Sequence, residues 1–79
     1  MNEYIQEELI ESTYLFCAKR ISDSEEARDL AQDILYEALR VIALGKTFVS
    51  FHSWYWRMAR NKYADYVAHK QNPALPIEV

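Results

Sequence analysis

One amphipathic stretch near the middle of the chain constrains the fold more than any other feature. In residues 23–45, DSEEARDLAQDILYEALRVIALG, apolar side chains recur at spacings of three and four, as in a helix with one buried face. Asp23 is a suitable N-cap, Glu26 stands at the capping-box position, and Gly45 can end the helix in the left-handed conformation. The pattern predicts a helix over about residues 24–43.

Weaker patterns predict one helix on each side of this one. Residues from about 4 to 21 have an apolar stripe, with acids early and bases late, as the helix dipole favours. A further helix over about residues 51–70 follows Ser50, a suitable cap, and ends before Pro73. Because the chain has only one glycine and two prolines, we expect an all-α fold, a compact bundle of three helices.

Length and composition bound the class of protein. The chain has 79 residues, enough for one small domain, and its 51% hydrophobic and 27% charged residues are typical of a soluble globular protein. No apolar run approaches the roughly 20 residues of a membrane span, and the acidic start is unlike a signal peptide. The single cysteine, Cys17, fits a reducing compartment and a small buried apolar role. These features predict a cytoplasmic protein.

Charge is distributed unevenly along the chain. Residues 1–45 carry ten acidic and four basic side chains, whereas residues 46–79 carry five basic and two acidic ones. Such asymmetry indicates either two surfaces for two kinds of partner or two ordinarily solvated faces, and charge alone does not choose between them.

The predicted third helix contains three consecutive aromatic residues that cannot all face one core, because neighbouring helical side chains diverge by about 100°. A helical wheel turns Tyr55 and Trp56 inward and leaves Trp54 outside with Arg57 and Asn61. An exposed ring, guanidinium and amide on one face suit recognition of unpaired bases. Alternatively, Trp54 packs against the preceding loop and stiffens it.

The predicted second helix also has an exposed polar face. Its carboxylates, amide and phenol recur at helical spacing opposite the apolar stripe, so this face is either a docking surface for a basic partner helix or simply solvated. The residues are Asp29, Gln32, Asp33 and Tyr36.

Signals for catalysis or cofactor binding are weak. His52 falls near the core stripe and is interpreted as a packing residue. Asp65 and His69, one turn apart, supply two metal ligands without an evident third. There is no glycine-rich phosphate loop or cysteine cluster, so the sequence predicts neither an enzyme, nor a cofactor, nor a metal site.

Two separated segments, SDSEEARDLAQDILYEALRVI and FHSWYWRMARNKYADYVAHKQ, carry a family resemblance. They contain an acidic turn, a D-L-x-Q-[DE] helix, a W-x-x-R-x-A-x-N stretch and an aspartate–tyrosine pair, in that order. From about Tyr14 to Gln71 the chain resembles region 2 of bacterial sigma factors, most closely the extracytoplasmic-function group. The resemblance implies that residues 1–71 form a region 2 domain and that residues 72–79 begin an interdomain linker.

The resemblance implies binding roles for particular residues of this chain. The helix that binds the clamp helices of the largest subunit of core RNA polymerase matches Asp29, Gln32, Asp33 and Tyr36. Positions that open and read the promoter minus-ten element match Trp54, Arg57 and Asn61. The loop Gly45 to Ser50, which includes Lys46, matches one that captures a flipped base of the non-template strand. Further phosphate candidates are Arg60, Lys62 and Lys70.

One departure from the family pattern bears on DNA binding. Sigma factors of this group usually finish the last helix with a run of arginines, whereas this chain reads AHKQN, which predicts a weaker phosphate grip. The alternative function is a degenerate or sequestered sigma-like domain that binds proteins and no DNA. An anti-sigma factor is a further candidate partner.

Overall fold

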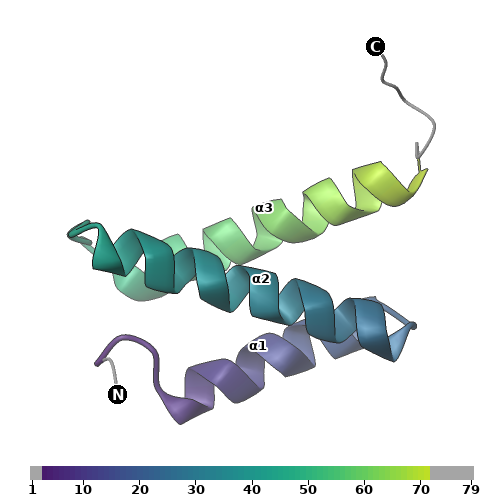
Figure 1. The fold of residues 1–79 in the computed structure, drawn as a ribbon, viewed down its shortest axis with the longest axis horizontal. Helices are drawn as coiled ribbons and strands as arrows, with labels where there is room; N and C mark the ends of the chain where they lie inside the picture. Colours follow the sequence, from purple (N-terminus) through teal and green to yellow (C-terminus); the bar gives the residue numbers. More distant parts are fainter. Residues whose placement is uncertain (1–2, 72–79) are drawn as a thin grey trace.

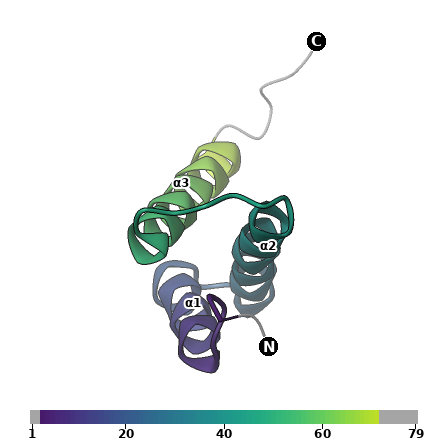
Figure 2. The same cartoon turned by 90° about the vertical axis from the view of Figure 1, so that its left-hand side faces the viewer.

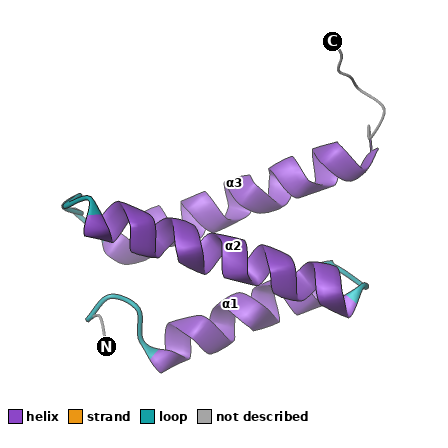
Figure 3. Ribbon diagram, in the orientation of Figure 1, coloured by secondary structure: helices purple, strands orange, loops and turns teal. Residues whose placement is uncertain are grey.

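The computed structural model describes residues 3–71, which form three α helices and no strand. In chain order, α1 spans Glu7–Arg20, α2 spans Ser24–Ala43 and α3 spans Phe51–Gln71 (Figure 3). The prediction of an all-α bundle of three helices is confirmed, and the bounds of α2 and α3 agree with those expected to within one residue. The segment 72–79, predicted to begin a linker, lies outside the described residues.

Successive helices run in opposite directions and form a compact bundle (Figure 1). Seen along the bundle in Figure 2, the three helices lie at the corners of a triangle, and the segment between α2 and α3 crosses one end. The C-terminal end of α3 rises away from α1 in Figure 1. The two ends of α3 therefore stand in different surroundings.

The first helix starts about three residues later than predicted. Gln6 is extended, with φ −107° and ψ 167°, and marks the end of a short non-helical segment. In that segment Ile5 is buried, while the ring of Tyr4 lies 5.5 Å from that of Phe48 and 4.8 Å from that of Phe51. These contacts join the segment to the core and to the loop before α3, and they explain why it packs as a bend instead of adding a turn to α1.

Both ends of α2 follow the local sequence signals. Oδ1 of Asp23 accepts the amides of Glu25 and Glu26 at 2.9 and 3.1 Å, and Gly45 has φ +90° just after the helix. The predicted cap and stop are thus confirmed. The second half of the predicted capping box is wrong, because the Glu26 carboxylate is bonded to side chains of α3 instead.

A buried hydroxyl pair joins α1 to α3 inside the core. Tyr55 is the largest fully buried side chain, and its hydroxyl lies 2.5 Å from that of Thr13. Thr13 donates its own proton to the Leu9 carbonyl at 2.7 Å, so it accepts the proton of Tyr55. Burial raises the pKa of Tyr55 to about 12. The inward orientation predicted for Tyr55 is confirmed.

Small and aliphatic side chains, most of them from α2, fill the rest of the core. The buried hydrophobic residues are Ile5, Cys17, Ile21, Ala27, Leu30, Ala31, Ile34, Ala38, Tyr55 and Ala59. Around this core the larger aromatics are only partly buried. Trp56, predicted to face inward, is one of these and packs against Phe16 with a centroid distance of 5.5 Å.

Candidate functional site

The loop after α2 and the first turns of α3 enclose an open pocket of about 380 Å³, here called the loop pocket. It brings together three of the side chains that were predicted to bind DNA, because the loop folds back over the start of α3. The residues that line it are Lys46, Thr47, Phe48, Val49, Ser50, Ser53, Trp54 and Arg57.

Aromatic rings form one wall of the loop pocket. The ring of Trp54 lies 4.9 Å from that of Phe48 and 5.8 Å from that of Phe51, measured between centroids. Trp54 is therefore partly buried, and the expectation that it stands outside the packed structure is wrong in that respect. Trp54 both packs against the loop and lines the pocket, so part of its ring remains accessible to a ligand.

Polar groups complete the loop pocket. The Lys46 ammonium lies 5.6 Å above the centroid of Phe48, a cation–π contact. Ser50 caps α3, as predicted: its Oγ accepts the amide of Ser53 at 3.2 Å and lies 3.1 Å from the Ser53 hydroxyl. Arg57 is exposed, and within residues 3–71 no carboxylate forms an ion pair with it.

Two further predicted DNA contacts lie beyond the loop pocket. Asn61 stands about one turn after Arg57 on α3 and is exposed, but it does not line the pocket. Arg60 is exposed as well, and the described residues provide it with no ion pair. The guanidinium groups of α3 are therefore accessible to an anionic ligand.

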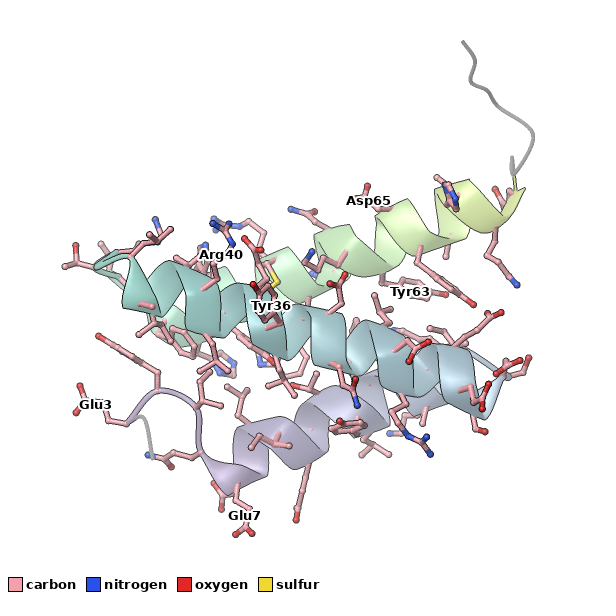
Figure 4. All side chains as sticks on the ribbon, viewed as in Figure 1. Glu3, Glu7, Tyr36, Arg40, Tyr63 and Asp65 are labelled. Atoms are coloured by element: carbon pink, nitrogen blue, oxygen red, sulfur yellow. The ribbon has the colours of Figure 1, made fainter. Side chains whose placement is uncertain are left out.

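A second concave surface, of about 840 Å³, lies between α2 and α3, and we call it the α2–α3 groove. The four side chains predicted to bind polymerase all line it, and Tyr36, on the middle of α2 in Figure 4, is 66% exposed. The lining residues from α2 are Glu26, Asp29, Leu30, Gln32, Asp33 and Tyr36. Those from α3 are Lys62, Asp65, Tyr66, His69 and Lys70.

Ion pairs cross the α2–α3 groove. Lys62 Nζ lies 3.5 Å from Asp33, and Lys70 Nζ lies 3.2 Å from Glu26, which also accepts a hydrogen bond from the Tyr66 hydroxyl. Lys62 and Lys70 were predicted as phosphate contacts, and here both are engaged by acids of α2. Helical spacing within α3 gave no sign of these partners.

Electrostatics at the end of the groove follow from this cluster. The hydrogen bond from Tyr66, followed by that from Lys70, holds the pKa of the Glu26 carboxyl below its usual value. The same bond to Glu26 raises the pKa of Tyr66 to about 12. Both shifts favour the state in which Glu26 is ionised and Tyr66 is protonated, so the contact persists at neutral pH.

The remaining residues considered for catalysis or metal binding do not lie together in one site. His52 is exposed, and the centroid of its ring lies 6.4 Å from that of Trp56, so its predicted place near the core is wrong. Burial raises the pKa of the Cys17 thiol. Within residues 3–71 no three His, Cys, Asp or Glu side chains are grouped to hold a metal ion, and no helix there is long and apolar enough to cross a membrane.

The fold and these surfaces define a small all-α domain with an aromatic loop pocket at one end and an acid-bearing groove along one side. Its sequence matches the sigma-70 region 2 family over residues 7–72, and the chain belongs to that family. No curated protein and no solved structure matches the chain. The resemblance to sigma factor region 2, a non-enzymatic transcription factor domain, is thereby confirmed, while the assignment to the extracytoplasmic-function group stays a prediction.

Proposed function

We propose that this chain is a transcription-initiation module that binds core RNA polymerase through the α2–α3 groove and single-stranded minus-ten DNA at the loop pocket. Membership of the sigma-70 region 2 family supports the general role. One observation carries the DNA half: the loop pocket unites aromatic rings with two cations, Lys46 and Arg57, that no carboxylate of residues 3–71 pairs with. Such a factor would act in the cytoplasm, with the polymerase.

The side chains of the loop pocket suit an unstacked base. Stacking on an aromatic side chain contributes about 1–3 kcal/mol per base, and cations beside the ring attract the phosphates that flank it. Extruding a base from a duplex costs a few kcal/mol, which capture in a pocket can offset. Arg57, Arg60 and Asn61 continue this surface along α3, so the strand would run from the loop toward the middle of the helix.

The DNA half can be tested by fluorescence anisotropy with a labelled single-stranded oligonucleotide of mixed sequence at low salt. Arg57→Gln is expected to weaken binding and to reduce the slope of log affinity against log salt by about 0.7, the value for one phosphate contact on a single strand. Arg28→Gln, which removes the same charge from an exposed position on α2, is the matched control. Equal effects of the two changes would contradict a specific role for Arg57.

The polymerase half rests on the exposed polar residues of α2. Asp29 and Gln32 are exposed, and on a rigid helix they can hydrogen-bond basic side chains of a partner helix. A fragment of the largest polymerase subunit that carries the clamp helices should bind the domain, and Asp29→Lys should abolish that binding. Glu11→Lys reverses an exposed acid on α1 and is the control. Undiminished binding by Asp29→Lys would overturn the assignment of this surface.

A second candidate function, protein binding without DNA, is favoured by one observation. Two of the predicted phosphate contacts, Lys62 and Lys70, are neutralised by Asp33 and Glu26, which leaves less free positive charge on α3. In that case the partner would be another regulator, such as an anti-sigma factor. Tight binding of a protein partner together with no oligonucleotide binding at low salt would select this function.

A further inference from the structure

We propose that the loop pocket selects an extruded base with a carbonyl oxygen at C6 of a purine or C4 of a pyrimidine, guanine or thymine, over adenine and cytosine, which carry an amino group there. The inference rests on the proposed function, because it concerns the base that the loop is proposed to capture. It adds a chemical selectivity that follows from the side chains of this particular loop.

The polar side chains of the loop pocket are strongly biased toward hydrogen-bond donors. Lys46 and Arg57 only donate, and none of the residues that line the pocket is a carboxylate or an amide. Two of the three hydroxyls are already engaged, because Ser50 accepts the Ser53 amide and the two hydroxyls lie 3.1 Å apart. The side chains of the pocket thus offer a base positive donors and few free acceptors.

The four bases differ in how well they can hydrogen-bond to donor side chains. Guanine presents the carbonyl O6 and thymine the carbonyl O4, whereas adenine and cytosine present amino groups at the corresponding positions, and the acceptor N7 is common to both purines. Side chains that read adenine are amides, and those that read the cytosine amino group are carboxylates. Neither kind lines the loop pocket, so an amino group there would find no carboxylate or amide side chain to accept it and would lie near the cations of Lys46 and Arg57. Adenine, which has no carbonyl oxygen at all, should bind weakest.

Stacking on the aromatic rings of the loop pocket does not discriminate between bases. The rings of Phe48 and Trp54 already touch, at 4.9 Å, and Lys46 covers a face of Phe48 at 5.6 Å, so a base stacks against an open face rather than between the two rings. Stacking of this kind is tolerant of sequence. Selectivity therefore falls to Lys46 and Arg57. Asn61, an amide that could read adenine, does not line the pocket.

Short single strands with one base among abasic sites provide the test, since the abasic strand alone reports the phosphate contribution. We expect guanine and thymine strands to bind at least about fivefold more tightly than the adenine strand, with cytosine between them. A purine series separates stacking area from edge chemistry: inosine, with its carbonyl at position 6, should bind like guanine, and 2,6-diaminopurine should bind like adenine. No preference, or a preference for the amino bases, would overturn the inference.

Variants of the loop pocket locate the selectivity. Arg57→Gln replaces a donor with an amide, so the guanine preference should disappear or shift toward adenine. Lys46→Gln provides a second, independent variant, and Arg28→Gln on α2 should leave the order of bases unchanged. If the wild-type domain binds none of these strands at low salt, the proposed function fails. If it binds strands with a base more tightly than the abasic strand, yet without the expected order, only the inference fails.

Discussion

The two halves of α3 are attached to the bundle by different kinds of interaction. In the first half, Tyr55 and Ala59 are fully buried, and the Tyr55 hydroxyl is satisfied inside the core. In the second half, residues 61–71 include no fully buried side chain. Tyr63 and Tyr66 are only partly buried against the core, and ion pairs and a tyrosine hydrogen bond join this half to Glu26 and Asp33 of α2. We call residues 51–60 of α3, which are held by buried side chains, the anchored half. Residues 61–71 are the braced half, and their polar contacts with Glu26 and Asp33 are the brace.

This difference separates the two proposed binding surfaces. The loop pocket is built on the anchored half, where a rigid base preorganises Trp54 and lowers the cost of ordering it on binding. The α2–α3 groove is bounded by the braced half, where exposed ion pairs each contribute only about 0–1 kcal/mol and are screened by salt. We therefore expect the groove to adjust to a partner while the loop pocket keeps its shape.

The largest effect is predicted for the anchor itself. Tyr55→Ala removes a fully buried ring and should lower the free energy of unfolding by about 3–5 kcal/mol, enough to unfold much of a small domain. Tyr66→Ala, in the braced half, should leave the domain folded. Urea unfolding followed by circular dichroism compares the two. Equal destabilisation would break the distinction between the halves.

A milder change at the same position keeps the first prediction measurable if the alanine variant does not fold. Tyr55→Phe keeps the ring and removes only the hydroxyl that donates to Thr13. Thr13 can still donate to the Leu9 carbonyl, so no buried donor is orphaned and the loss should be about 1 kcal/mol.

The next largest effect is predicted for Trp54. Trp54→Ala should weaken binding of a single-stranded oligonucleotide by about 1–3 kcal/mol, since it removes a stacking surface. Its contacts with Phe48 and Phe51 contribute to stability as well, at about 0.5–1.5 kcal/mol for each such pair. Anisotropy and thermal unfolding on the same samples separate the two effects. A large loss of stability with unchanged binding by the folded fraction would make Trp54 purely structural.

Local signals in the sequence predicted much of the fold because they act within one helix. The cap at Asp23, the stop at Gly45 and the cap at Ser50 each involve partners within a few residues, and all three are present in the structure. The apolar spacing between them predicted the buried face of α2. The loop pocket was anticipated by the family resemblance, which pointed to Trp54 and Arg57 and to the loop beside them.

Contacts between distant residues could not be predicted in the same way. Lys62 and Asp33 are 29 residues apart and Lys70 and Glu26 are 44 apart, so the sequence of α3 gave no reason to exclude either lysine as a phosphate contact. The partial burial of Trp54 depends on how the loop folds over it. The polar core position Thr13 was missed because its partner lies 42 residues away.

A smaller effect is predicted at Gly45, which positions the loop pocket relative to α2. Nothing lies within 4 Å of a Cβ placed at this residue, yet its φ of +90° is unfavourable for other residues. Gly45→Ala should therefore cost about 1–2 kcal/mol through backbone strain alone. Because the loop begins here, oligonucleotide binding should weaken while binding at the α2–α3 groove is retained. Unchanged unfolding and binding would show that the loop tolerates another path.

The smallest effect is predicted for the brace, where it appears as a dependence on pH. Hydrogen bonds from Tyr66 and then Lys70 lower the pKa of Glu26 in the folded domain. Its contribution to stability is therefore fully present above the pKa of an unfolded glutamate, about 4.3, and is lost as pH falls through the lowered folded value. Glu26→Gln removes this charge, so the thermal midpoints of wild type and variant should converge between about pH 6 and about pH 3.

Glu11→Gln, which changes an exposed acid on α1, is the matched control for Glu26→Gln and should show no such convergence. Tyr66→Phe removes the hydrogen bond that contributes most to the lowered pKa of Glu26. The pH dependence of stability should therefore weaken but not vanish, because the hydrogen bond from Lys70 remains. A constant difference between wild type and Glu26→Gln across this pH range would show that the brace does not stabilise the fold. The second half of α3 would then be held by the partly buried rings of Tyr63, on the inner side of the helix in Figure 4, and Tyr66.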